Sequence, residues 1–333
     1  MSPRRAAAVS PSGVRGLRLP PALLRPGIRQ LGRRVLDPAL PWETQRRRLD
    51  RIAAASLAPR GVTVAERVLD GVRAEVVVAG GVRPLRTVVC FHGGGYCVGS
   101  ARLVRPWAAA LSAAAGCRVI VPEYRLAPEH PYPAALSDGL AVLSALFSEV
   151  SPESVVVAGD SAGGGLALAV VLARRESGEK LPAGCVLVSP WLDLGRDRSR
   201  VPGLVRRDVL LSPGWLAACA SAYIGGGAGS GGAGSGGGSG SGSAGWADPL
   251  VSPLRAAHGG LPPLLIQAGS DELLAPDARA LAASASAAGT DVTYTRWPRL
   301  WHDFPLQAGL IAAADSAVAQ AAWFVETVTD NSG

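Results

Sequence analysis

The chain has 333 residues, of which 48% are hydrophobic and 18% are charged, and its formal net charge is +7. This apolar fraction is too high for a chain that is disordered throughout, and the length suits one large domain or two small ones. No stretch of 18 uncharged apolar residues occurs, which argues against a membrane-spanning protein. We therefore expect a globular protein without stable insertion into a membrane.

The positive charge is concentrated at the amino terminus. Residues 1–60 hold 13 Arg and three acidic residues, a net charge of +10, whereas the remainder holds 20 basic and 23 acidic groups, a net charge of −3. A basic arm can bind nucleic acid or an anionic membrane, but no aromatic stacking platform accompanies these arginines. We predict instead a solvated amphipathic helix around Arg46–Ile52, with its charged side outward, and no nucleic-acid partner.

The cysteines and the amino terminus indicate the compartment. The five Cys are odd in number and form no CxxC pair, so neither a zinc site nor a disulfide framework is expected. The Arg-rich first 34 residues contain no apolar segment of the kind that a secretory signal needs. Both observations favour a reducing, cytoplasmic location.

Short apolar strands alternate with longer helical segments from residue 87 onward. This alternation predicts an α/β fold with a mainly parallel sheet covered by helices on both faces, whose ligands bind beyond the carboxyl ends of the strands. The predicted strands are Thr87–Phe91, Arg118–Val121, Val155–Ala158, Gly184–Val188, Leu264–Ala268 and Asp291–Thr295. The predicted helices are Trp107–Ala115, Ala134–Phe147, Ala162–Arg174, Ala278–Ala288 and Ala312–Val328.

One segment interrupts this alternation. Residues 225–245 consist of 13 Gly, five Ser and three Ala. Such a composition cannot bury a core, and it predicts a flexible surface loop.

The first chemical motif is Gly159-Asp160-Ser161-Ala162-Gly163, a GxSxG sequence between a predicted strand and a predicted helix. The GxSxG string alone is a weak signal, because a chain with 42 Gly can contain it by chance. Its position between a strand and a helix, however, is typical of a nucleophile elbow. Gly159 and Gly163 remove side chains that would clash in so tight a turn. We predict Ser161 as a nucleophile at the amino end of the following helix, where the helix dipole favours a developing anion.

A second motif, His92-Gly93-Gly94-Gly95, also follows a predicted strand directly. Its glycines allow backbone N–H groups to approach a substrate oxygen, and with the N–H of Ala162 they would form an oxyanion hole. His92 is expected to position this loop rather than to act as a base.

The base and the acid must come from later in the chain, because the order in α/β-hydrolases is Ser, then Asp or Glu, then His. His302 follows the predicted strand Asp291–Thr295, whereas His258 lies among Gly and Pro and is expected to be a solvated loop residue. Asp271 follows the strand Leu264–Ala268 and is predicted to hold the imidazole of His302, with the adjacent Glu272 as the alternative. Asp277 is predicted to cap the next helix.

Five motifs together resemble the hormone-sensitive lipase family of α/β-hydrolase esterases, in order and at family-like spacing over about residues 60–330. They are HGGGYCVGS (92–100), PEYRLAPEHPYPAAL (122–136), GDSAGGGLAL (159–168), LPPLLIQAGSDELL (261–274) and WHDF (301–304). The resemblance implies carboxylic-ester hydrolysis through an acyl-enzyme, an oxyanion hole at Gly94, Gly95 and Ala162, and no cofactor or metal. It implies a catalytic domain over residues 61–333. It also implies a helical cap built from residues 1–60 and about 193–246, and it makes a homodimer plausible.

Two departures from the family pattern stand out. His302 is followed by Asp303, where the family often has Gly or a small apolar residue, so this carboxylate either raises the pKa of the base or faces solvent. The Gly-Ser-Ala tract replaces a shorter connection in or beside the cap, which leaves the size of the acyl pocket open.

The expected activity is hydrolysis of small esters with short- to medium-chain acyl groups by Ser161, His302 and Asp271. A transacylase or amidase would use the same three residues, so the sequence does not separate these reactions. A ligand receptor on the same scaffold, as in the plant gibberellin receptors that resemble the family, is disfavoured because those receptors have lost the base.

Overall fold

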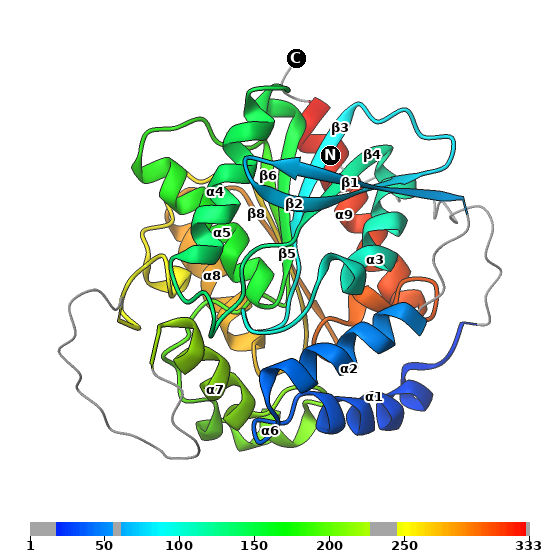
Figure 1. The fold of residues 1–333 in the computed structure, drawn as a ribbon, viewed down its shortest axis with the longest axis vertical. Helices are drawn as coiled ribbons and strands as arrows, with labels where there is room; N and C mark the ends of the chain where they lie inside the picture. Colours follow the sequence, from blue (N-terminus) through cyan, green and yellow to red (C-terminus); the bar gives the residue numbers. More distant parts are fainter. Residues whose placement is uncertain (1–17, 56–60, 227–244, 331–333) are drawn as a thin grey trace.

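The structure, a computed structural model, describes residues 18–55, 61–226 and 245–330. Within them, eight strands form one twisted sheet in the order β1-β2-β4-β3-β5-β6-β7-β8 (Figure 1). Strands β3 to β8 run parallel to one another, which confirms the predicted mainly parallel sheet. Their bounds are Arg86–Phe91 for β3, Cys117–Pro122 for β4, Val155–Asp160 for β5, Gly184–Val188 for β6, Leu264–Gly269 for β7 and Val292–Trp297 for β8.

An antiparallel hairpin at one edge was not predicted. Strands β1 (Val62–Leu69) and β2 (Val72–Ala79) pair along their whole length, and β2 then pairs antiparallel with β4. Asp70 and Gly71 join them with positive φ angles of 45° and 81°, the backbone geometry that favours an Asp-Gly turn between two strands. This dipeptide between two Val-rich runs was the sequence signal for the hairpin.

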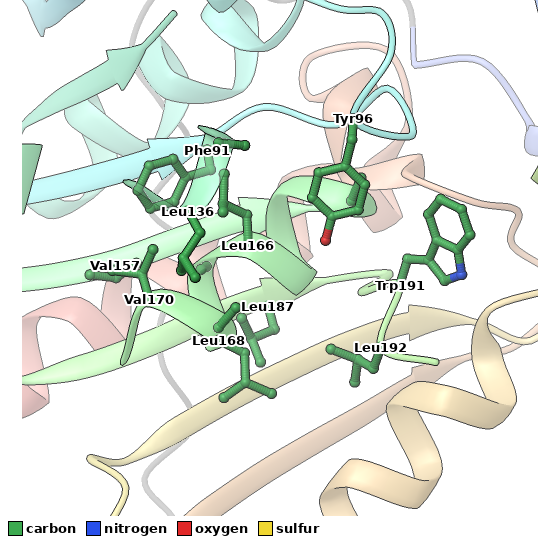
Figure 2. Close-up of a cluster of buried hydrophobic side chains, with 14 of the residues drawn as sticks. Phe91, Tyr96, Leu136, Val157, Leu166, Leu168, Val170, Leu187, Trp191 and Leu192 are labelled. Carbon is green, nitrogen blue, oxygen red and sulfur yellow. The ribbon is translucent and has the colours of Figure 1, made fainter. Parts of the chain in front are cut away.

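Helices cover both faces of the sheet, as predicted. One face packs on α3 (Ala101–Ala115) and α9 (Ala312–Asp330), and the other packs on α4 (Ala134–Phe147), α5 (Ala162–Glu176) and α8 (Ala275–Ala287). Successive residues of each strand alternate between the two cores, since side chains along a strand point to opposite faces. The larger core, with Phe91, Val157, Leu166 and Leu187 at its centre, fixes α5 against β3, β5 and β6 (Figure 2).

The first turn of α8 differs from the prediction. The helix begins at Ala275, so Asp277 lies inside it rather than capping it. The side chain of Asp277 is fully buried and accepts hydrogen bonds of 3.1 Å from the N–H groups of Leu192 and Asp193. It also forms a buried ion pair of 2.6 Å with Arg198. Asp277 therefore anchors the chain that follows β6.

Replacing Asp277 with alanine should destabilise the protein by about 3–5 kcal/mol, because it leaves the guanidinium of Arg198 buried without its counter-charge. Urea unfolding followed by circular dichroism measures this loss. Replacing the exposed Asp291, which precedes β8, with alanine is the matched control and should change the free energy of unfolding by about 0.5 kcal/mol or less. Equal losses in both variants would contradict the anchoring role.

Four helices gather at one end of the molecule, at the bottom of Figure 1, and we call them the cap helices. They are α1 (Pro21–Val35), α2 (Trp42–Ala55), α6 (Pro202–Arg207) and α7 (Pro213–Tyr223). Trp215 of α7 donates a 2.8 Å hydrogen bond to Gln45 of α2, so segments 170 residues apart are joined. The predicted cap segments, residues 1–60 and 193–246, contain these helices; the division into domains itself stays a prediction.

The amphipathic helix predicted around Arg46–Ile52 is α2, but its arginines do not all face solvent. Arg46 donates to the carbonyl oxygens of Cys97 and Ala127 at 2.8 Å and pairs with Glu129, so it connects α2 to the loops that carry these residues.

All five cysteines are buried and free. No helix of residues 18–55, 61–226 or 245–330 is long and apolar enough to cross a membrane. The Gly-Ser-Ala tract lies, apart from its ends, outside the described residues.

Candidate active site

The connection after β5 is the predicted nucleophile elbow. Ser161 stands between the last residue of β5 and the first of α5 with φ 54° and ψ −120°, a conformation that non-glycine residues rarely adopt. A Cβ atom at Gly159 would overlap the carbonyl of Gly163, and one at Gly163 would overlap the carbonyl of Phe91. Only glycine at both positions allows the turn to close, which explains why Ser161 presents its hydroxyl beyond the sheet.

The elbow lies at the point where the strand order of the sheet reverses. β3 leads to α3 on one face and β5 leads to α5 on the other, and the register of these two parallel strands pairs Phe91 with Gly159. Crevices at such switch points are where open α/β sheets bind ligands. The His92–Gly95 loop and Ser161 are therefore neighbours because of the topology.

His302 contacts Ser161, the predicted nucleophile. Its Nε2 lies 2.9 Å from Oγ of Ser161, and the two residues are 1% and 3% exposed. The loop after β8 is held in place by the loop after β7, since the N–H of Ser270 bonds to the carbonyl of Trp297 and that of Asp271 bonds to Leu300, at 2.8 and 2.9 Å. The predicted pairing of Ser161 and His302 is thus present in the structure.

The structure does not place Asp271 against the imidazole, and this corrects the predicted partner. Oδ2 of Asp271 accepts two hydrogen bonds, of 3.0 and 2.7 Å, from Arg25 of α1, and its Oδ1 lies 3.7 Å from Nε of Arg207 in α6. Arg25 also donates to the carbonyl of Arg207 at 3.2 Å. Asp271 therefore joins two cap helices to the loop after β7.

Glu272, the alternative that the sequence left open, faces His302 instead. Its Oε2 lies 3.4 Å from Nδ1 of His302, the nitrogen on the far side of the ring from Ser161, and the side chain is fully buried. The two neighbouring carboxylates therefore have different partners: Arg25 pairs with Asp271, and the imidazole of His302 faces Glu272. The arrangement Ser161, His302, Glu272 is a hydroxyl, an imidazole and a carboxylate in series.

Ser189 is a contributor that the sequence did not reveal. It follows β6, and its hydroxyl donates a 2.8 Å hydrogen bond to Oε2 of Glu272 while accepting one of 3.2 Å from the N–H of Asp303. One side chain thus fixes both the carboxylate behind the imidazole and the residue that follows the imidazole. No local motif marks Ser189, because its partners lie 83 and 114 residues away in the chain.

The loop after β3 carries Gly94 and Gly95, the two glycines of the predicted oxyanion hole. The N–H of Gly93 is occupied by Oδ1 of Asp160 at 3.0 Å, and the carbonyl of Gly94 is turned away to accept from Cys97 and Val98. Across the described part of the chain, the N–H groups of Gly94 and Gly95 donate to no backbone or side-chain acceptor. The N–H of Ala162 belongs to the first turn of α5, where helical N–H groups lack intrahelical partners.

His92 positions this loop, as expected, and its chemistry does not suit a base. Its Nδ1 contacts the carbonyl of Gly93 at 2.8 Å, and its ring stacks on Tyr124 with 4.3 Å between ring centroids. Tyr124 in turn donates a 2.6 Å hydrogen bond to the carbonyl of His92. Burial lowers the pKa of His92 to about 4, so the ring is neutral at physiological pH.

His258 is not the solvated loop residue that the sequence predicted. It is 2% exposed, with Nδ1 at 2.8 Å from the hydroxyl of Ser284 and Nε2 at 2.9 Å from the carbonyl of Pro253. The Gly- and Pro-rich context concealed a packing role that depends on α8. The structure therefore leaves His302 as the imidazole that contacts Ser161.

The charges around His302 strongly favour its protonated form. Burial lowers the pKa of this imidazole, but the adjacent carboxylates of Asp303 and Glu272 outweigh burial and hold the pKa well above its ordinary value. Burial raises the pKa of Glu272 to about 7, against the opposing effect of His302 and Ser189. Burial and the charge of Asp303 also raise the pKa of Asp160.

Comparison with known proteins shows to which family the chain belongs. Residues 88–232 and 239–306 match a family model described as the alpha/beta hydrolase fold. A crystal structure of an esterase from the bacterial hormone-sensitive lipase family superimposes with a TM-score of 0.82 and 30% identity, covering 93% of this chain and 100% of that one. The chain belongs to the hormone-sensitive lipase family of α/β-hydrolase esterases.

Other relatives and a second solved structure support the same family. An acetyl-hydrolase of Streptomyces hygroscopicus is 38% identical over 253 residues, which are 74% of this chain and 79% of the relative. An esterase of Acinetobacter venetianus is 31% identical over 275 residues, 82% of this chain and 85% of the relative. A hormone-sensitive lipase from a metagenome library superimposes with a TM-score of 0.84 and 30% identity, covering 94% of this chain and 100% of that one. The predicted fold and the predicted class of ester hydrolase are thereby confirmed.

Proposed function

We propose that this family member hydrolyses carboxylic esters with short- to medium-chain acyl groups through an acyl-enzyme on Ser161. The observation that carries the proposal is the 2.9 Å contact between Ser161 and His302, with Glu272 on the opposite side of the ring. A buried hydroxyl hydrogen-bonded to an imidazole that is itself oriented by a carboxylate is the general arrangement of an activated nucleophile.

In the first half-reaction, Oγ of Ser161 attacks the ester carbonyl while Nε2 of His302 takes the hydroxyl proton. Glu272, across the ring, stabilises the imidazolium that forms and keeps the remaining proton on Nδ1. The carbonyl oxygen becomes an anion, which the N–H groups of Gly94, Gly95 and Ala162 would receive. Losing one such donor typically costs about 3 kcal/mol of transition-state stabilisation.

The first half-reaction ends when the proton on Nε2 passes to the leaving alcohol, the C–O bond of the ester breaks and the acyl group stays on Ser161. A water molecule then attacks the acyl carbonyl, with Nε2 of His302 as its base, and the acid departs as Oγ regains its proton. The same steps with an alcohol or an amine in place of water give transacylation, and an amide in place of the ester gives amidase activity. The name of the Streptomyces relative, an acetyl-hydrolase, supports hydrolysis of short acyl groups.

A fluorophosphonate should label Ser161 covalently, because the activated Oγ displaces fluoride to form a stable phosphonyl ester. Peptide mass spectrometry should find one phosphonyl group, on the peptide containing Gly159–Gly163, and denatured protein should remain unlabelled.

Turnover of p-nitrophenyl esters of graded acyl length then tests the substrate range, with the highest kcat/KM expected for short acyl chains. Product analysis with added butanol or butylamine separates hydrolysis from acyl transfer. Labelling elsewhere, with Ser161 unmodified, would overturn the proposal.

A further inference from the structure

A second carboxylate touches the reactive nitrogen of His302. Oδ2 of Asp303 lies 3.0 Å from Nε2, the same atom that lies 2.9 Å from Oγ of Ser161. The side chain of Asp303 is only 11% exposed, so it does not simply face solvent. One imidazole nitrogen therefore has two partners, the nucleophile and a carboxylate.

The backbone of Asp303 is held firmly in this position. Its φ of 55° and ψ of 31° are left-handed, a conformation that Asp tolerates better than most residues but that still needs support. Its N–H donates to the hydroxyl of Ser189 at 3.2 Å, and its carbonyl accepts from the N–H of Leu306 at 3.1 Å. Because Ser189 also donates to Glu272, one hydroxyl holds both the carboxylate of Glu272 and the backbone of Asp303.

We propose that Asp303 is a second hydrogen-bond acceptor for the N–H at Nε2 of His302, and that it thereby sets the pH at which the imidazole becomes available as a base. The inference rests on the proposed function, in which Nε2 must be unprotonated to activate Ser161. When Nε2 carries a proton, the carboxylate of Asp303 stabilises it; when Nε2 is free, the same carboxylate loses its donor and is left close to a lone pair. The contact therefore favours the protonated ring, as an opposite charge at hydrogen-bond distance does.

Other ionisable groups also surround the ring. Glu272 faces it from the loop after β7, Asp160 from the end of β5 and Asp208 from the chain after α6. Burial raises the pKa of both Asp160 and Asp208. Asp303 differs from them in its direct contact with Nε2 and from Glu272 in lying at the nitrogen that exchanges protons with substrate.

The proton balance during catalysis follows from this arrangement. The O–H bond of Ser161 breaks and the Nε2–H bond of His302 forms, and in the proposed role Asp303 accepts a hydrogen bond from that N–H. The proton then leaves Nε2 for the departing alcohol oxygen. Asp303 neither takes nor supplies a proton overall, so its contribution lies in the pKa of the ring.

The variant Asp303→Asn tests the proposal, because it removes the charge and keeps the size. The base works only when it is neutral. In wild-type protein the midpoint of the acidic limb in the pH profile of kcat/KM should therefore lie above the ordinary titration range of His. In Asp303→Asn this limb should move to lower pH by about 1–3 units. At a pH one unit below the wild-type midpoint, a shift of one unit raises the active fraction about fivefold. Asp291→Asn, which removes an exposed carboxylate beside the amino end of β8, should leave the limb in place.

A direct titration keeps the test independent of turnover. NMR of imidazole-labelled protein, with the His302 signal assigned from a His302→Gln variant, should give a wild-type pKa above the ordinary value and a lower one in Asp303→Asn. A wild-type pKa at or below the ordinary value, or the same pKa in both proteins, would overturn the role of Asp303 even if the enzyme is active. Absence of ester turnover with a raised, Asp303-dependent pKa would count against the proposed function and leave the role of Asp303 supported.

Discussion

Replacing Ser161 with alanine should lower kcat for p-nitrophenyl acetate on the order of 10⁵-fold, the scale on which loss of a triad nucleophile acts in other serine hydrolases. The physical reason is that no other hydroxyl occupies the elbow, so the covalent route through an acyl-enzyme closes. Weak residual catalysis should remain, since donors at Gly94, Gly95 and Ala162 still stabilise an oxyanion. Steady-state kinetics at saturating ester measure the loss.

A matched serine provides the control for this variant. Ser316 is exposed on α9 and bonds only to the carbonyl of Ala312 four residues earlier, so Ser316→Ala should keep wild-type kcat. Circular dichroism and thermal unfolding should show that both variants are folded. Near-wild-type turnover by a folded Ser161→Ala protein would contradict the proposed nucleophile.

Replacing Glu272 with glutamine should lower kcat by about 10³–10⁴-fold, the size of loss seen when a triad acid elsewhere becomes an amide. An amide cannot balance the charge of the imidazolium, and its N–H₂ group would face Nδ1 where a proton acceptor is needed. The pKa of His302 should fall as well, because Glu272 is one of the carboxylates that raise it. Comparing kcat and the acidic limb of the pH profile between wild type and Glu272→Gln measures both effects.

The neighbouring carboxylate gives the sharpest comparison. Asp271→Asn should lower kcat by less than about tenfold, because Asp271 faces Arg25 and Arg207 rather than the imidazole. Both proteins should be compared at equal folded fraction, measured by urea unfolding. A large loss in Asp271→Asn with near-wild-type turnover in Glu272→Gln would restore the assignment that the sequence favoured.

Much of the architecture was predictable because the physical signals are local. The apolar runs of β3 to β8, the glycines around Ser161 and the order of Ser, acid and His all lie in short stretches of sequence. The edge hairpin β1–β2 also had a local signal, its Asp-Gly turn, although the mostly exposed strand β1 did not suggest a core.

The choice between Asp271 and Glu272 could not be predicted locally. Both residues lie in one turn, and the side of the turn that each carboxylate faces depends on Arg25, 246 residues away. The same holds for Ser189 and Asp303, whose contacts join the ends of different strands. Spacing along a chain identifies which residues arrive at one edge of a sheet, but it does not determine how neighbouring side chains divide their partners there.

The contact between Arg25 and Asp271 has a mechanical consequence. The loop that presents Glu272 to His302 is bonded, at the preceding residue Asp271, to Arg25 of α1. We therefore expect a displacement of α1 to shift the loop after β7, and with it the carboxylate that faces His302.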